Sequence, residues 1–210
     1  MKIYKIGIIG CGGIAKKMAA TLGKMKEVQR YAVASRNQEK AQAFANEWGF
    51  EKAYGSYEEL ANDPQVDLIY IATPHAMHYD NARMCIEKGK PVLCEKAFTA
   101  NARQAEELLS FAHEKKVFIT EAIWTRYMPL SLTIQDLLKK GVIGTPYTLS
   151  ANLSYPISDK ERIIRPELAG GALLDIGVYT LNFAAMAFGD DIAETHSACQ
   201  KLSLIHISEP

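Results

Sequence analysis

Lys96, Asp175 and Tyr179 are the residues best suited, by type and position, to take part in a reaction. Lys96 and the preceding Glu95 come directly after an apolar run (residues 91–94), where a buried strand would end. Asp175 and Tyr179 are four residues apart on a mostly apolar stretch, so a helix would place them on one face. An amine and a phenol can exchange a proton with an alcohol or a carbonyl, and a carboxylate can bind the hydroxyls of a polyol. These residues predict proton transfer on an oxygen-bearing substrate.

The same residues also fit purely structural roles. Lys96 and Glu95 fit a solvated surface pair, whereas Tyr179 fits a core aromatic residue and Asp175 a structural cap. Burying a carboxylate on an apolar helix costs free energy unless it finds a partner, so we expect the face that carries Asp175 to border a polar cavity. The position of Lys96 at the carboxyl end of a strand likewise favours a functional site.

A glycine-rich turn near the N-terminus matches the dinucleotide-binding pattern G-x-G-x-x-A. It follows an apolar run and opens a helical stretch, the context that gives this short motif its meaning. Gly10 permits the tight turn, Gly12 lets a pyrophosphate approach the main chain, and Ala15 allows the helix to pack closely on the strand. A turn with only a structural role is the alternative. The predicted cofactor-binding residues here are Gly10, Cys11, Gly12, Gly13, Ile14 and Ala15.

The end of the next strand predicts which cofactor is preferred. A carboxylate there would bind the ribose 2′-hydroxyl of NAD and repel the 2′-phosphate of NADP. This chain has Ser35 and Arg36 instead, and a guanidinium can bind a phosphate through two hydrogen bonds. We therefore predict that NADP(H) is preferred over NAD(H). The alternative for Arg36 is a solvated loop arginine.

Residues 73–78 follow a further apolar run and include two histidines. Ligands of α/β proteins bind at the carboxyl edge of the parallel sheet, so we expect this segment to lie beside the nicotinamide of the cofactor. Two histidines three residues apart also suggest a metal ion. No third ligand is apparent nearby in the sequence, and we predict no metal site. The predicted contacts in this region are Thr73, Pro74, His75, His78, Glu95 and Lys96.

The elements that must position these residues are read from the hydrophobic pattern. Short apolar runs alternate with helix-like stretches over the first 120 residues, which predicts an α/β Rossmann fold with a doubly wound parallel sheet and helices on both faces. The predicted strands are Ile3–Ile9, Arg30–Ser35, Ala53–Tyr54, Leu68–Ala72, Pro91–Cys94 and Val117–Thr120. The predicted helices are Ile14–Met25, Gln38–Trp48, Tyr57–Ala61, Ala76–Lys88 and Ala102–Lys115.

The pattern changes after Glu121, where we expect a second domain to begin. An amphipathic helix over Leu130–Lys140, a strand over Thr145–Ser154 and an apolar helix over Ala172–Phe188 are predicted. We therefore expect an NADP-binding Rossmann domain (1–121) and an incomplete α+β substrate and dimerisation domain with an open, mainly antiparallel sheet (122–201). The last residues (202–210) resemble a translated sequencing-library adapter, and we interpret them as a non-native tail rather than a terminal strand.

Composition favours a folded protein without a charge-driven partner. The 210 residues hold 24 basic and 24 acidic side chains, so no net field attracts nucleic acid or an anionic membrane. The sequence shows neither a secretory signal nor a run of about 20 apolar residues, and we expect no membrane contact and a cytoplasmic location. Four cysteines lack metal-ligand spacing and are expected to be reduced core thiols: Cys11, Cys85, Cys94 and Cys199.

Three motifs together resemble the glucose-fructose oxidoreductase and inositol dehydrogenase family. They are the glycine-rich turn (residues 10–15), the Glu95-Lys96 pair and the segment that runs from Gly170 to Tyr179. Residues 53–60 and 121–127 look like signatures of the branch that contains dihydrodiol and D-xylose 1-dehydrogenases. The resemblance covers essentially residues 3–200, and the combined motifs are much more specific than the glycine turn alone.

The resemblance implies NADP-dependent oxidation of a carbinol on a sugar or vicinal diol, or reduction of the matching carbonyl. Lys96 and Tyr179 would handle the proton, and Asp175 would hold the substrate. Trp124 and Arg126 would shape the substrate pocket. The partner is then a small polyol or sugar, and a full-length relative is expected to be a homodimer. The alternatives are an anhydro-sugar or keto-sugar reductase and a noncatalytic nucleotide-binding regulator.

Two features depart from the family pattern. Ala97 stands where the family has a proline, and a cis bond without proline costs about 2.5 to 4 kcal/mol, so we expect a trans bond and a slightly displaced loop. Family members are also longer by about half, and we expect part of the second domain to be missing from this chain. Its incomplete sheet would expose an edge and apolar surface.

Overall fold

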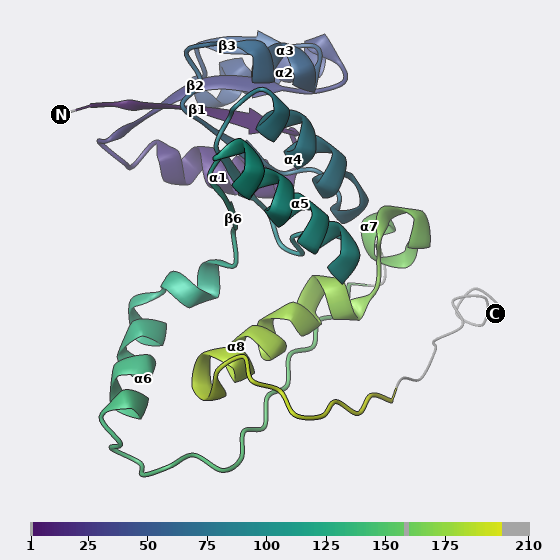
Figure 1. Cartoon of the computed structure of the whole chain (residues 1–210). Helices are drawn as coiled ribbons and strands as arrows, with labels where there is room; N and C mark the ends of the chain where they lie inside the picture. Colours follow the sequence, from purple (N-terminus) through teal and green to yellow (C-terminus); the bar gives the residue numbers. More distant parts are fainter. Residues whose placement is uncertain (1, 158–159, 199–210) are drawn as a thin grey trace.

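Six parallel strands form a single sheet in the N-terminal half of the chain (Figure 1). The structure is a computed structural model that describes residues 2–157 and 160–198, so the expected non-native tail and Cys199 lie outside the described residues. The strand order is β3-β2-β1-β4-β5-β6, which confirms the predicted doubly wound Rossmann sheet. The strands are β1 (Tyr4–Ile9), β2 (Val28–Ala34), β3 (Lys52–Tyr54), β4 (Leu68–Ile71), β5 (Val92–Cys94) and β6 (Ile119–Glu121).

Helices cover both faces of this sheet. Successive strand residues point to opposite faces, so Ile8 and Tyr70 pack on one side while their neighbours Ile9 and Ile71 pack on the other. The first side is covered by α1 (Gly13–Leu22) and α2 (Gln38–Trp48). The second is covered by α3 (Tyr57–Asn62), α4 (His78–Glu87) and α5 (Ala102–Lys115). Side chains of β1, β2 and β4 are thereby buried on both faces, as their continuous apolar runs predict.

A buried carboxylate links three segments at the amino-terminal edge of the sheet. Asp63 follows α3 and is only 6% exposed. Its Oδ2 accepts hydrogen bonds from the hydroxyls of Tyr31 (3.1 Å) and Tyr54 (2.7 Å) and from Lys52 Nζ (2.8 Å). Burial alone would raise the pKa of Asp63, but these donors outweigh it and hold the pKa well below the usual value. Asp63 therefore ties β2 and β3 to the loop that leads into β4.

The second half of the chain consists of helices and irregular segments and contains no strand within residues 122–157 and 160–198. The predicted strand over Thr145–Ser154 is wrong, and the expected antiparallel sheet is not formed there. A strand needs a neighbour to satisfy its backbone N–H and C=O groups, and no second strand is available beside it. The elements are η2 (Trp124–Tyr127), α6 (Pro129–Lys139), α7 (Glu161–Ile164), η3 (Pro166–Leu168), η4 (Leu173–Gly177) and α8 (Val178–Phe188).

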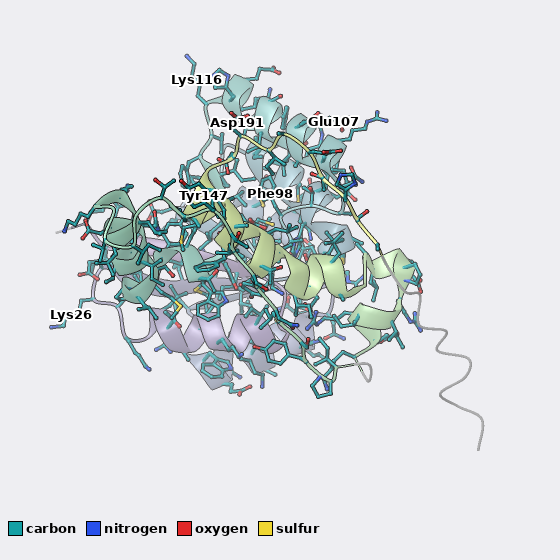
Figure 2. All side chains as sticks on the ribbon, turned by 90° about the horizontal axis from the view of Figure 1, so that it is seen from below. Lys26, Phe98, Glu107, Lys116, Tyr147 and Asp191 are labelled. Carbon is teal, nitrogen blue, oxygen red and sulfur yellow. The ribbon has the colours of Figure 1, made fainter. Side chains whose placement is uncertain are left out.

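The α8 helix lies below the Rossmann sheet and beside α6, and α7, η3 and η4 lie between the two along the chain (Figure 1). Seen from below, α8 crosses the middle of the molecule, while Glu107 and Lys116 of the α5 region lie at the periphery (Figure 2). Large apolar side chains on this lower side are exposed, including Leu173, Leu181 and Tyr147. Exposed apolar surface is therefore present, as expected, although no sheet edge contributes to it.

One helical stretch corrects the expectation that the chain holds no long apolar run. Pro166–Phe188 spans 23 residues and contains an 18-residue window with a mean hydropathy of 1.4, which is long and apolar enough to cross a membrane by length and composition. The stretch includes the π-helical turn η4 and the charged Asp175, which pairs with Lys96 from the Rossmann sheet. We interpret it as a helix that contributes to the site described below.

The cysteines of the described chain are free thiols. Cys85 and Cys94 are buried and Cys11 is half-buried, which agrees with the expected reduced core thiols. Burial raises the pKa of Cys85 to about 12, and burial also raises the pKa of Cys94 well above its usual value. These two thiols are therefore held in the protonated, unreactive form.

Candidate active site

The glycine-rich turn joins β1 to α1 and leaves an open cradle at the start of the helix. Gly10 has φ +102°, and a Cβ there would lie 2.8 Å from the carbonyl oxygen of Ala72, so the turn requires glycine at this position. A Cβ on Gly12 or Gly13 would meet nothing within 4 Å, which shows free space above the turn. No side chain caps the α1 N-terminus. Its first N–H groups are therefore available to a phosphate, and the cradle fits a dinucleotide pyrophosphate.

The other residues of the turn have separate roles. Ala15 is fully buried and lets α1 pack against the sheet, as predicted. Ile14 is 40% exposed at the start of the helix, beside the open cradle. The Cys11 thiol lies 3.9 Å from the carbonyl oxygen of Ala34, and burial raises its pKa. Cys11 therefore contributes packing and main-chain groups rather than a thiolate.

The end of β2 carries two cations and no carboxylate at the position that distinguishes the two cofactors. Ser35 is buried, and its backbone N–H donates to the carbonyl of Tyr54 at 3.1 Å. Arg36 is exposed and interacts with the hydroxyl of Tyr57. Lys40, in the first turn of α2, is exposed and acts electrostatically on Cys11 of the glycine turn. Sequence reasoning missed Lys40, although its place four residues after Arg36 was a usable signal.

The segment after β4 turns through Pro74 into the short helix η1 (His75–Met77). Asn81 Nδ2 donates to Thr73 Oγ1 at 3.1 Å, which fixes the start of this turn. His75 Nδ1 lies 3.2 Å from the carbonyl oxygen of Ala169 and so connects the Rossmann sheet to the segment before η4. Burial lowers the pKa of His75, and the nearby Lys96 cation acts in the same direction. His75 is therefore neutral near pH 7 and binds the carbonyl as an N–H donor.

His78 lies behind the site rather than on its surface. The side chain is fully buried, with Nδ1 at 2.7 Å from the Ala97 carbonyl oxygen and Nε2 at 2.8 Å from the Thr73 carbonyl oxygen. Burial lowers its pKa, and the two carbonyls oppose that shift. Both ring nitrogens are engaged by the loops after β4 and β5, which corrects the expectation that His78 touches the cofactor directly. Within the described residues no group of three or more His, Cys, Asp or Glu side chains could hold a metal ion.

The turn that carries Lys96 is held on both sides by hydrogen bonds. The Lys96–Ala97 peptide bond is cis, so the expectation of a trans bond is wrong. The Ala97 carbonyl faces His78, and the Phe98 N–H donates to Glu121 Oε1 at 2.8 Å. These contacts, from α4 on one side and β6 on the other, fix the turn without the proline found in the family.

Glu95 is buried beneath Lys96. Its carboxylate accepts a hydrogen bond from the Tyr70 hydroxyl and another, at 3.2 Å, from the Lys96 N–H. Burial raises the pKa of Glu95, and the Tyr70 hydrogen bond opposes that shift. Glu95 therefore supports the Lys96 turn from within the sheet, and the expected contact of Glu95 with the cofactor stays a prediction.

A change at Glu121 should alter the pH dependence of stability. Burial, and secondarily the charge of Glu95, raise the pKa of Glu121 in the folded state above its usual value of 4.5. The folded state thus holds this proton more tightly, and the stabilisation is present below pH 4.5 and lost as the pH rises through the folded-state pKa. Glu121→Gln retains an acceptor for the Phe98 N–H.

We therefore expect the unfolding free energy of this variant, relative to wild type, to be larger at pH 7 than at pH 4. Urea unfolding at the two pH values measures the difference. Glu114→Gln, on the exposed side of α5, is the matched control and should show little change. An equal relative stability of Glu121→Gln at both pH values would contradict the expectation.

Lys96, Arg162 and Asp175 form the charged centre of the site. Lys96 Nζ lies 3.1 Å from Asp175 Oδ1 and 2.5 Å from the main-chain oxygen of Asp175. Arg162 Nη1 lies 2.6 Å from the same Oδ1. Burial would raise the pKa of Asp175, but hydrogen bonds from Arg162 and Lys96 outweigh it and lower the pKa. The buried Asp175 carboxylate is therefore paired with two cations, whereas the polar cavity expected on this face stays a prediction.

The π-helical turn η4 (Leu173–Gly177) explains how Asp175 presents two oxygens to Lys96. The wider hydrogen-bond spacing of a π-turn interrupts the regular α-helical ladder, and such turns are frequent at functional sites. The main-chain oxygen of Asp175 is thereby available to Lys96 together with the side chain. The predicted helix over Ala172–Phe188 is confirmed, with the π-turn η4 forming its first part and α8 (Val178–Phe188) the rest.

Tyr179 lies on α8, one turn after Asp175, and completes the centre. Trp124 Nε1 donates to the Tyr179 hydroxyl at 3.1 Å, and the two rings meet edge to face. Lys96 Nζ lies 5.0 Å from the centroid of the Tyr179 ring. The structure thus brings Lys96, Trp124 and the pair Asp175 and Tyr179 together from three separate segments. An amine and a phenol stand side by side at the carboxyl edge of the sheet, as proton exchange with a carbinol requires.

Arg126 lies apart from this centre. It lines a surface hollow of about 400 Å³ between η2, α6 and α8, together with Tyr127, Gln135 and Met186. Trp124, which was predicted to shape the same pocket as Arg126, contacts Tyr179 instead. The two residues expected to shape one pocket therefore face different parts of the structure.

Comparison with known proteins places the chain in a family. Residues 4–122 match the model of an oxidoreductase family with an NAD-binding Rossmann fold, and residues 131–204 match the GFO/IDH/MocA C-terminal domain. This chain belongs to that oxidoreductase family. The first match spans the sheet and the glycine turn described above. The chain therefore carries the NAD-binding Rossmann fold of this oxidoreductase family, in agreement with the resemblance of its motifs.

Relatives with named activities are similar over most of this chain. Trans-1,2-dihydrobenzene-1,2-diol dehydrogenase of Xenopus laevis is 41% identical over 196 residues, which are 92% of this chain and 59% of the relative. D-Xylose 1-dehydrogenase (NADP(+)) of Hypocrea jecorina is 42% identical over 201 residues, 85% of this chain and 51% of the relative. A solved 3-ketoreductase from Actinomadura kijaniata in complex with NADP has a TM-score of 0.78 at 29% identity, covering 90% of this chain and 56% of its own. The chain spans about half to three fifths of these proteins.

Proposed function

We propose that this chain carries the dinucleotide domain and reaction centre of an NADP(H)-preferring dehydrogenase that acts on a carbinol of a sugar or vicinal diol. The convergence of Lys96, Tyr179 and Asp175 at the same sheet edge as the open glycine cradle is the observation that carries this proposal. The named relatives that act on a diol and on xylose support the same substrate class. The partner is accordingly a small polyol or sugar.

The bound nicotinamide would supply the hydride acceptor in oxidation and the hydride donor in reduction. The phenol oxygen of Tyr179 accepts the Trp124 N–H, which leaves the phenol proton free to point at a substrate oxygen. The Lys96 ammonium beside the ring stabilises negative charge that develops on the phenol or on the substrate oxygen. Asp175 holds that ammonium in place through two oxygens. Proton exchange therefore falls to Tyr179 and Lys96.

The preference for NADP(H) is supported by the charges at the end of β2. Arg36 and Lys40 are both exposed there, and the family position for a ribose-binding carboxylate is occupied by Ser35-Arg36 instead. A guanidinium and an ammonium favour a 2′-phosphate over a 2′-hydroxyl. The relative from Hypocrea jecorina and the solved 3-ketoreductase are both described with NADP, which agrees with this preference.

Replacing Arg36 with alanine should weaken NADPH binding by about tenfold or more, since one charge-assisted phosphate contact is lost. NADH binding should change by less than about twofold, because NADH has no 2′-phosphate. Energy transfer from the tryptophans to the reduced nicotinamide measures both affinities. Lys24→Ala removes an exposed cation near the end of α1 and serves as the control. An equal loss of affinity for NADPH and NADH would contradict the role assigned to Arg36.

A keto-sugar reductase is the second candidate function, favoured by the similarity to the solved 3-ketoreductase. The same Lys96 and Tyr179 would then donate a proton to the oxygen that forms from the carbonyl. Absorbance at 340 nm separates the two: NADP+ with vicinal diols and aldoses tests the dehydrogenase, and NADPH with keto-sugars tests the reductase. Tight NADPH binding without turnover in either direction would favour the noncatalytic regulator.

A further inference from the structure

We propose that Arg162 is a specificity-determining residue that binds the substrate oxygen on the carbon next to the reacting carbinol. The inference rests on the proposed function, because it takes Lys96 as the group that faces the reacting oxygen. It assigns the second oxygen of a vicinal diol to a residue that neither the sequence motifs nor the expected site included.

The charged centre places the Lys96 ammonium and the Arg162 guanidinium against one carboxylate oxygen. Lys96 Nζ and Arg162 Nη1 lie 3.1 Å and 2.6 Å from the same Asp175 Oδ1. Oxygens on adjacent carbons are separated by about one hydrogen-bond length. A substrate with one oxygen at Lys96 therefore brings its neighbouring oxygen within reach of the guanidinium.

Arg162 retains N–H donors for that oxygen, whereas the Asp175 side chain is almost fully buried. A guanidinium carries five N–H donors in a planar fork, and the structure gives Arg162 a single ion-pair partner among the described residues. Its side chain is 48% exposed, so the rest of the fork is accessible. The Asp175 side chain is 5% exposed and its Oδ1 already accepts from both cations. The substrate-binding role expected of Asp175 is thus exerted through Arg162 and Lys96.

The segment that carries Arg162 is fixed to the rest of the site. A Cβ on Gly170 would collide with the carbonyls of Ile163 and Arg165, and the Gly171 N–H donates to the Ile163 carbonyl at 2.8 Å. These close contacts fold α7 back onto the glycine pair that precedes η4. His75 binds the adjacent Ala169 carbonyl from the Rossmann sheet. The guanidinium is therefore held in position before a substrate arrives, which favours selective binding.

Paired ligands that differ by one hydroxyl test the proposal. Trans-1,2-cyclohexanediol and cyclohexanol are titrated by calorimetry into the NADP+-loaded chain. We expect wild type to bind the diol at least about tenfold more tightly than the mono-alcohol, because the second hydroxyl gains a hydrogen bond to a charged donor. In Arg162→Met this ratio should fall to about twofold or less, and binding of cyclohexanol should stay nearly unchanged.

The ratio separates specificity from a merely structural role. If Arg162 only held Asp175 in place, its loss would weaken the binding of both ligands equally. The ratio of the diol and cyclohexanol affinities would then stay at the wild-type value, and this result would overturn the proposal. Arg165→Met is the matched control, since Arg165 lies on the same segment but pairs with Glu161 and Glu167, and it should retain the wild-type ratio. Arg162→Lys keeps the charge without the planar fork and should give an intermediate ratio, which provides a second test if the methionine variant does not fold.

Two further outcomes are distinguishable. Equal binding of diol and mono-alcohol by wild type, or binding of neither, would overturn the role of Arg162. Wild type could instead prefer the diol, lose that preference in Arg162→Met and show no hydride transfer in either direction. This result would support Arg162 as the residue that recognises the diol, and it would contradict the proposed dehydrogenase function.

Discussion

Replacing Lys96 with methionine should reduce turnover of a vicinal diol or aldose by about 10²- to 10⁴-fold, the usual contribution of a positioned proton-transfer group. Methionine preserves the length of the side chain but supplies no charge and no proton. The variant loses the contacts to Asp175 Oδ1 and to its main-chain oxygen, and it loses the cation beside Tyr179. Steady-state rates at 340 nm with NADP+ measure the effect.

NADPH binding reports on the fold of the same variant. The glycine cradle and the end of β2 are built from other segments, so NADPH affinity should stay within about threefold of wild type. Lys24→Met is the control and should leave both turnover and affinity unchanged. Full turnover by Lys96→Met would remove this residue from the mechanism, and a parallel loss of NADPH binding would show that its role is in the cofactor site.

Asp63→Ala should lower the free energy of unfolding by about 3 kcal/mol, since it removes the acceptor of three side-chain donors. Two of them are the hydroxyls of Tyr31 and Tyr54, and the third is the ammonium of Lys52. The backbone N–H of Gln65 also loses its bond to Oδ1. Urea unfolding at pH 7, followed by circular dichroism, measures this loss.

The pH dependence gives a second readout for Asp63. Its folded-state pKa lies below the unfolded value of 3.8, so its stabilisation is present above that pH and lost as the pH falls through the folded-state pKa. The difference in unfolding free energy between wild type and Asp63→Ala should therefore be largest at pH 7 and should decrease below about pH 4. Asp80→Ala, on the exposed surface of α4, should cost less than about 1 kcal/mol. Similar losses of unfolding free energy in both variants would contradict the role of Asp63 in linking β2, β3 and the loop before β4.

The Rossmann half could be predicted from the sequence because its local signals agree with each other. The same parallel sheet is indicated by the continuous apolar strands, the helices between them and the glycine turn. A parallel sheet brings the carboxyl ends of all its strands to one edge. Lys96 and the Thr73–His75 turn follow from that rule alone. Asp175 and Tyr179 followed from helical spacing, and the cost of burying a carboxylate correctly indicated that Asp175 has a polar partner.

The remaining features depend on contacts that local patterns do not encode. Arg162 lies on a short helix with no apolar periodicity, and only the folding of α7 onto Gly170 brings it to Asp175. Glu95 and His78 lie at the predicted edge of the sheet, yet both point inward to hold the loops. The alternating pattern of Thr145–Ser154 indicated a strand, but a strand forms only where another strand pairs with it.

The bond from Lys96 to the main-chain oxygen of Asp175 makes part of the site insensitive to mutation. A side-chain carboxylate disappears with a single codon change, whereas a peptide carbonyl is present whichever amino acid occupies the position. A chain that exchanged residue 175 while keeping its π-turn would still anchor the lysine at one point. Substitutions at this position could therefore accumulate over evolution and alter which polyols are accepted, without releasing the amine from its place.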